Sequence, residues 1–93
     1  MDQEQATIFI LADGTGETAA TMIRAAVVQY SDLEINIVRC KNVRTEEQIE
    51  SLIEDVYAQK GIIVFTMVSP HMSRKVMDLA GQKGLQAVDL MGP

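Results

Sequence analysis

Short apolar runs alternate with longer stretches of helical periodicity along the whole chain. The apolar runs fall at residues 6–12, 34–40, 61–66 and 85–90, and they predict four β-strands. Between these runs, apolar residues recur at spacings of three and four, which is typical of a helix with one buried face. The pattern therefore predicts the order strand, helix, strand, helix, strand, helix, strand.

Capping signals set the limits of the predicted helices. The first helix runs from about Glu17 to Tyr30. Thr45 is a suitable N-cap for the second, and Gln48 three residues later completes a capping-box pattern. The third begins at Ser69-Pro70 and ends at Lys83-Gly84, with serine as cap and proline at the first helical position.

The residues of the apolar stripes on these helices are expected to lie in the core. The first stripe comprises Ala19, Met22, Ile23, Ala26, Val27 and Tyr30. The second comprises Ile49, Leu52, Ile53, Val56 and Tyr57. The third comprises Val76, Leu79 and Ala80.

The alternation of strands and helices predicts a parallel sheet with right-handed crossovers. We expect a three-layer α/β fold of Rossmann or flavodoxin-like type, with four strands in the order 2-1-3-4 and three helices. The first helix should cover one face and the other two the opposite face. The weaker hydrophobicity of residues 34–40 suits an edge strand. Ligands bind such folds where the strand order reverses, which places the loop at 13–18 beside the loop at 66–71.

Composition excludes several classes of function. The chain has 93 residues, 47% of them hydrophobic, which suits one domain with a real core. Its net charge of −5 argues against a nucleic-acid partner. The single cysteine, Cys40, cannot form an internal disulfide, so we expect a cytoplasmic protein. No apolar run approaches the roughly 18 residues of a membrane span, and the acidic start MDQEQ is unlike a signal peptide.

The loop Asp13-Gly14-Thr15-Gly16-Glu17-Thr18 is the first candidate site. Its glycines permit close approach of the backbone, and the N–H groups at the start of the following helix favour an anion such as phosphate. Threonine hydroxyls would add donors. The acidic side chains of Asp13 and Glu17 fit better with a metal ion or a basic partner nearby. The alternative is a tight turn that binds nothing.

Three basic residues near the end of the second strand form a further cluster. Arg39, Lys41 and Arg44 have no acidic residue among them, so they are candidates to hold a second phosphate or an acidic partner segment. The alternative is pairing with Glu46 and Glu47 of the next helix. We favour pairing for Lys41 and a functional role for Arg44.

A possible pocket at the third helix adds Ser69, His71 and Arg74 to Arg44. His71 is the only histidine, and its place near the strand-order reversal allows general acid–base chemistry. The alternative is a solvated residue at a helix start. The sequence has no Ser-His-Asp arrangement, no metal-spaced Cys and His set and no G-x-x-x-x-G-K-[ST] loop. It therefore assigns neither a catalytic residue nor a metal site.

Two families have loops of this kind. Thr15 to Thr18 is similar to the T/S-x-T-G-x-T loop with which flavodoxins surround the phosphate of FMN. Flavodoxin-like domains, however, have five strands and aromatic residues that enclose the flavin ring. This chain has four predicted strands and no tryptophan. A small phosphate- or FMN-binding module is therefore the alternative hypothesis.

A more extensive resemblance covers nearly the whole chain. It resembles the N-terminal part of the regulatory proteins of phosphoenolpyruvate synthase and pyruvate, phosphate dikinase. Their D-S-T-G-E-T-A loop is matched by 13–19, and their V-R-T-E-E-Q segment by 43–48. T-x-V-x-P is matched by 66–70, and D-L-x-G-P by 89–93. Gly14 stands where the family usually has serine, so one hydroxyl donor is absent.

The resemblance implies a bifunctional enzyme. Such proteins phosphorylate a threonine of the target enzyme with ADP as donor, and they remove that phosphate with inorganic phosphate, releasing pyrophosphate. In the family the chain continues, and the glycine-rich nucleotide loop lies in the later part. We therefore expect residues 1–93 to be an N-terminal domain that is inactive alone and lacks its C-terminal domain. Completing the active site, contacting the target enzyme and forming a homodimer are the roles left open.

Overall fold

Four parallel strands form the sheet. In the computed structural model, which describes residues 4–27 and 33–91, they are β1 (Glu4–Ala12), β2 (Leu33–Cys40), β3 (Ile62–Thr66) and β4 (Ala87–Asp89). The strand order is β2-β1-β3-β4, and each neighbouring pair is parallel. Among these residues the structure confirms the predicted order and the edge position of the second strand.

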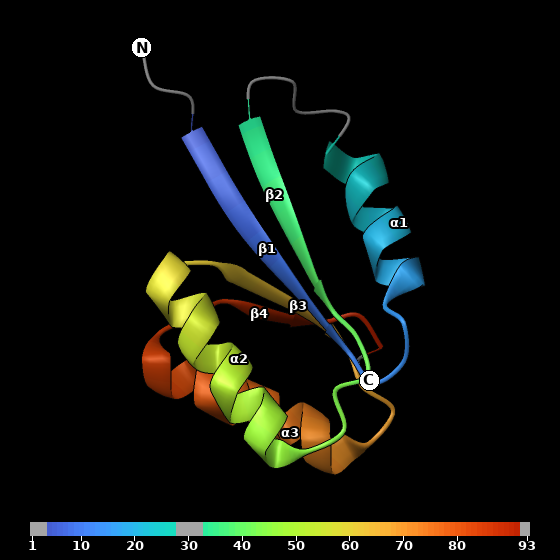
Figure 1. The fold of residues 1–93 in the computed structure, drawn as a ribbon, viewed down its shortest axis with the longest axis vertical. Coiled ribbons are helices and arrows are strands. Elements are labelled where there is room, and N and C mark those ends of the chain that lie inside the picture. The colour runs from blue at the N-terminus through green and yellow to red at the C-terminus, as the bar shows by residue number, and fades with distance from the viewer. Residues whose placement is uncertain (1–3, 28–32, 92–93) are drawn as a thin grey trace.

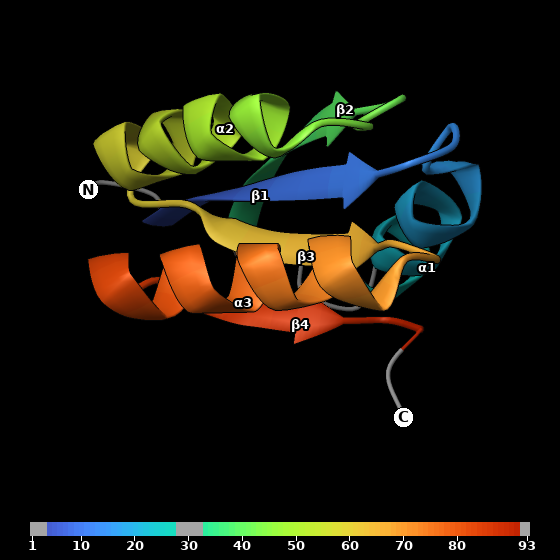
Figure 2. The same ribbon diagram turned by 90° about the horizontal axis from the view of Figure 1, so that it is seen from below.

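Three helices of the described residues complete a three-layer arrangement, as predicted. They are α1 (Glu17–Val27), α2 (Glu46–Gln59) and α3 (Pro70–Lys83). Figure 1 and Figure 2 show α2 and α3 side by side on one face of the sheet and α1 on the other. The first helix was predicted to continue to Tyr30, but positions 28–30 lie outside the described residues.

Local signals in the sequence determine where α2 and α3 begin. The Gln48 N–H donates to Thr45 Oγ1 at 3.1 Å, and the Thr45 N–H donates to Gln48 Oε1 at 2.9 Å, so the predicted capping box is present. At α3 the Met72 N–H donates to Ser69 Oγ at 3.3 Å, with Pro70 in the first turn. These bonds satisfy donors that a helix leaves without partners at its start.

The fourth strand is shorter than the predicted run at 85–90. Gly84 adopts a left-handed conformation with φ of 70°, and the N–H of Leu85 turns back to the carbonyl of Ala80 at 2.8 Å. The first residues of the run thus close the end of α3, in the manner of a Schellman turn, before the strand begins.

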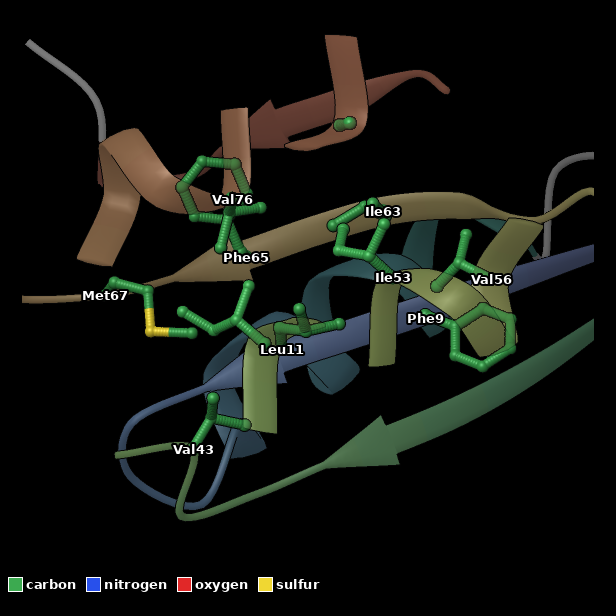
Figure 3. Close-up of a cluster of buried hydrophobic side chains, with 11 residues drawn as sticks. Phe9, Leu11, Val43, Ile53, Val56, Ile63, Phe65, Met67 and Val76 are labelled. Carbon is green, nitrogen blue, oxygen red and sulfur yellow. The ribbon is translucent and has the colours of Figure 1, made fainter. Parts of the chain in front are cut away.

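The larger part of the core lies between the sheet and the pair α2 and α3 (Figure 3). Its buried members are Phe9, Leu11, Val43, Ile49, Ile53, Val56, Ile63, Phe65, Met67, Val76 and Ala80. A smaller cluster lies under α1 and consists of Ile10, Ala19 and Ala20, with Ile8, Ile23 and Ile37 packed against it. The core therefore covers both faces of the sheet, and its larger part lies on the face that α2 and α3 cover.

Within residues 4–27 and 33–91, three residues of the predicted stripes are exposed. Tyr57 is 52% exposed, and its ring lies beneath the Lys83 ammonium, 4.9 Å from ring centroid to Nζ. Met22 is 52% exposed and Ala26 is also exposed. Because α1 approaches the sheet through the small side chains of Ala19 and Ala20, Met22 and Ala26 turn toward solvent.

Candidate functional site

The loop after β1 and the loop after β3 meet at the carboxyl edge of the sheet. The Asp13 N–H donates to the Thr66 carbonyl at 3.4 Å, and the Val68 N–H donates to Asp13 Oδ2 at 2.8 Å. This confirms the expectation that the point where strand order reverses brings these two loops together. The Asp13 carboxylate joins them directly.

The start of α1 is built by Thr15 and Gly16. Gly16 has φ of 72°, a left-handed conformation that glycine adopts at little cost, and its carbonyl accepts the Ala20 N–H at 3.0 Å. Thr15 Oγ1 accepts the Glu17 N–H at 3.3 Å. The Glu17 N–H, which was predicted to be free for an anion, is therefore already bonded to Thr15. The N–H groups of Thr18 and Ala19 lie in the first turn, where no preceding helical turn supplies acceptors.

Strand β2 and the residues directly after it hold the same loop. The N–H of Asn42 donates to the Gly14 carbonyl at 2.8 Å, and that of Val43 to the Ala12 carbonyl at 2.9 Å. Arg39 Nε donates to the Thr15 carbonyl at 2.6 Å. The glycine-rich loop is thus fixed by contacts from both neighbouring strands of β1.

Arg39 is the contact that sequence reasoning missed. It was grouped with Lys41 and Arg44 as a basic cluster, and only Arg44 was placed in a candidate pocket. Strand register identifies Arg39, because it pairs with Ile10 of β1, close to the start of the loop. Its guanidinium group puts positive charge beside a loop that contains two acidic residues.

A cavity of about 350 Å³ opens on the glycine-rich loop. The six predicted loop residues line it, together with Ala19, Met22, Thr66, Leu90 and Met91. Leu90 arrives there because its N–H donates to the Phe65 carbonyl at 3.0 Å, which extends the pairing of β4 beyond the strand itself. The contribution of residues 90–91 was not predicted, although a fourth parallel strand must also end at this edge.

The second predicted pocket is separate from the loop cavity. Its residues, Arg44, Ser69, His71 and Arg74, do not line that cavity. Arg44 lines a separate hollow of about 420 Å³ with Glu46, Glu47, Glu50 and Met72. His71 is exposed, and its Nε2 lies 2.8 Å from Glu46 Oε2. Ser69 caps α3, and Arg74 is exposed on the same helix. The functional roles predicted for these residues stay predictions.

Acidic and basic side chains link the starts of α2 and α3. Hydrogen bonds from His71 and then Lys75 hold the pKa of Glu46 below its ordinary value. Lys75 Nζ also lies 3.0 Å from Glu50 Oε2, and this bond raises the pKa of the ammonium. The predicted alternative, pairing of Arg39, Lys41 and Arg44 with Glu46 and Glu47, was wrong for these described residues, Lys41 included. Glu46 pairs instead with His71 and Lys75 of α3, because those side chains face it across the two helix starts.

Residues 4–27 and 33–91 offer neither a metal-binding cluster nor a membrane-spanning helix. That part of the chain contains no group of three or more His, Cys, Asp or Glu side chains arranged to hold a metal ion. None of its helices is long and apolar enough to cross a membrane. Cys40 is half-buried, and burial, followed by the charge of Asp55, raises the pKa of its thiol.

Replacing Asp13 by alanine should separate the two loops. We expect a loss of about 1–2 kcal/mol in the free energy of unfolding, because the Val68 N–H loses a charged acceptor at 2.8 Å. Asp13→Asn keeps an oxygen in the same place and should lose about half as much. Urea titration measures both, and equal losses for the two variants would contradict a role for this hydrogen bond.

Fold and cavity define the class as an α/β protein with a parallel sheet and a glycine-rich loop at the reversal of strand order. The family model described as "Kinase/pyrophosphorylase" matches residues 8–93. The chain belongs to this kinase/pyrophosphorylase family.

Curated relatives have a consistent name, pyruvate, phosphate dikinase regulatory protein. The relative from Bdellovibrio bacteriovorus is 49% identical over 92 residues, which cover 99% of this chain and 33% of that protein. Those from Pelobacter propionicus and Geobacter metallireducens are each 39% identical, over 91% and 90% of this chain and 30% and 31% of theirs. The chain thus spans about a third of the length of the curated relatives that it matches.

Proposed function

We propose that this chain is the N-terminal domain of a bifunctional kinase and phosphorylase that regulates pyruvate, phosphate dikinase or phosphoenolpyruvate synthase. The full-length enzyme transfers a phosphoryl group from ADP to a threonine of the target, which switches the target off. In the reverse regulation, inorganic phosphate takes the phosphoryl group from the phosphothreonine and leaves as pyrophosphate. Family membership and the names of the relatives support this proposal.

The observation that supports a local role is the cavity on the glycine-rich loop. We assign it to a phosphate group of the nucleotide, of inorganic phosphate or of the phosphothreonine. The first turn of α1 offers N–H donors and the positive end of its dipole, and Thr18 adds a hydroxyl. Asp13 accepts the Val68 N–H, and the guanidinium of Arg39 offsets the acidic charge of the loop.

In this proposal the domain is inactive when isolated. Phosphoryl transfer depends on the positioning of nucleotide and metal ion, and the glycine-rich nucleotide loop belongs to the remaining two thirds of the enzyme. The domain contributes one wall of the active site. The small phosphate- or FMN-binding module remains the alternative, and the same titration tests it.

The test is a thermal-shift titration of the chain with phosphate, pyrophosphate, ADP and FMN, with sulfate as the ionic control. A ligand that binds only the folded state stabilises it by about 2.7 kcal/mol at a hundredfold excess over its dissociation constant. We expect phosphate, pyrophosphate or ADP to raise the melting temperature more than sulfate does. Stabilisation by FMN alone would favour the alternative module.

Thr18→Val provides the residue-level prediction. Loss of one hydroxyl donor, worth about 1 kcal/mol, should weaken phosphate binding roughly fivefold and leave the unliganded melting temperature nearly unchanged. Thr21→Val is the matched control, since Thr21 is an exposed residue of the same helix that does not line the cavity. Equal ligand responses in the two variants would remove Thr18 from the site.

A further inference from the structure

The face of the sheet that α1 covers is protected only in part. Strand register places Ile10, Val64 and Val88 in one row across β1, β3 and β4, so their side chains share a face. Ile10 packs against α1 and is 0% exposed, Val64 is 8% exposed and Val88 is 50% exposed. Cover by α1 therefore decreases steadily toward β4.

The opposite face is protected at the same strands. Ile63 and Phe65 of β3 are fully buried beneath α2 and α3, and Ala87 of β4 packs against that cluster. Figure 2 shows both helices on this side, with α3 running along β3 and β4. Within the described residues, the β4 side of the α1 face has no equivalent helix.

The uncovered area is apolar and continues to the loop cavity. Val88 of β4 and Leu90, which directly follows the strand, are two positions apart and so share one face, and Leu90 is 37% exposed. Met22 of α1 and Met91, which are 52% and 55% exposed, line the cavity together with Leu90. We call Met22, Val88, Leu90 and Met91 the β4 patch. Exposed apolar side chains gathered in this way mark an interaction surface.

Chain topology restricts what covers this surface. A right-handed crossover that leaves β4 for a strand beyond it would place its helix on the α3 face, as the β3-α3-β4 connection does. That helix cannot reach the β4 patch. In a longer chain that continues the sheet in this way, cover on the α1 face would come from an element beyond that crossover.

We propose that the β4 patch is the docking surface for an apolar helix contributed by the chain beyond residue 93 in the full-length protein. The inference rests on the proposed function, in which residues 1–93 are about the first third of the enzyme. The curated relatives, three times as long as the region they share with this chain, have the chain length that this requires. A helix there would bury the patch as α2 and α3 bury the other face.

Charge disfavours a second copy of this domain as the occupant. Asp13 and Glu17 line the cavity that adjoins the patch, and the chain has a net charge of −5. Two copies joined through this surface would bring acidic groups together. A helix from the remainder of the enzyme, in contrast, would also close the open side of the loop cavity and contribute groups to the phosphate site.

The test compares the reactivity of a thiol at position 88 in a short and a long protein. The short one is the 93-residue chain, and the long one is a chimaera in which the remaining two thirds of the Bdellovibrio relative follows residue 93. Both contain Cys40→Ala and Val88→Cys. Met77→Cys is the matched control, because Met77 is 47% exposed on α3.

We expect maleimide labelling at position 88 to be at least tenfold slower in the chimaera than in the short chain, with labelling at position 77 unchanged. Equal rates at position 88 would overturn the proposal. So would protection in the short chain that increases with protein concentration, since the occupant would then be a second copy.

A second measurement keeps the proposal testable if the chimaera does not fold. Hydroxyl-radical footprinting would compare the intact Bdellovibrio protein with its own region that matches residues 1–93. Residues aligned with the β4 patch should be protected only in the intact protein, and equal footprints would overturn the proposal. If the patch is protected in the intact protein but the thermal-shift titration shows no response to phosphate or ADP, the result counts against the proposed function and not against the docking surface.

Discussion

Truncation of Phe65 to alanine is expected to lower the free energy of unfolding by about 3–5 kcal/mol. Phe65 is 0% exposed on β3, between the sheet and the pair α2 and α3 (Figure 3). The surrounding side chains come from several elements and cannot all move to fill the space. A domain of this size has a total stability of about 5–14 kcal/mol, so the variant loses a large part of it.

Urea titration and thermal melting measure this effect. Each kcal/mol lowers the melting temperature of such a domain by about 4–8 °C, so a shift of at least about 12 °C is expected. Tyr57→Ala is the control, because it removes an aromatic ring that is 52% exposed and contacts Lys83. Its loss should stay below about 1 kcal/mol. Similar losses for the two rings would contradict the described core.

Replacing Gly16 by valine is expected to cost about 2–5 kcal/mol. The left-handed conformation at φ of 72° costs an L-residue about 1–2 kcal/mol, and more when its side chain is branched. A Cβ atom there would also lie 3.3 Å from Ala12 Cβ and from Ile10 Cγ2, and such crowding adds about 1–3 kcal/mol.

Gly14→Val is the matched control in the same loop. A Cβ atom on Gly14 would have nothing within 4 Å, and its φ is not positive. We expect the urea midpoint of this variant to stay close to that of the unchanged chain. If both substitutions destabilise equally, loop conformation at Gly16 is not the cause.

The fold was predictable because the different signals in the sequence indicate the same structure. Strand runs, helical periodicity and the caps at Thr45 and Ser69 all indicate one alternating topology, and the handedness rule then leaves few arrangements. What failed was the rotation of individual helices. Met22 and Tyr57 lie at the margins of their stripes, and the tertiary packing of small residues such as Ala20 decides which margin is buried.

The candidate site was predictable in position but not in its internal contacts. Glycine spacing and the strand-order rule located the loop and its neighbour. The partners of Asp13 and Arg39 could not follow from local sequence, because the first contact joins residues 55 positions apart and the second joins residues 24 apart. Such bonds depend on the exact register of the strands.

The bond between Asp13 and Val68 has a consequence for folding during synthesis. The glycine-rich loop lies near the start of the chain, yet its shape depends on β3 and on a residue 55 positions later. A nascent chain that ends before Ile62 therefore lacks both β3, one neighbour of β1, and Val68, the partner of Asp13. Because parallel pairing between distant segments forms slowly, we expect this loop, although synthesised early, to acquire its final conformation among the last parts of the domain.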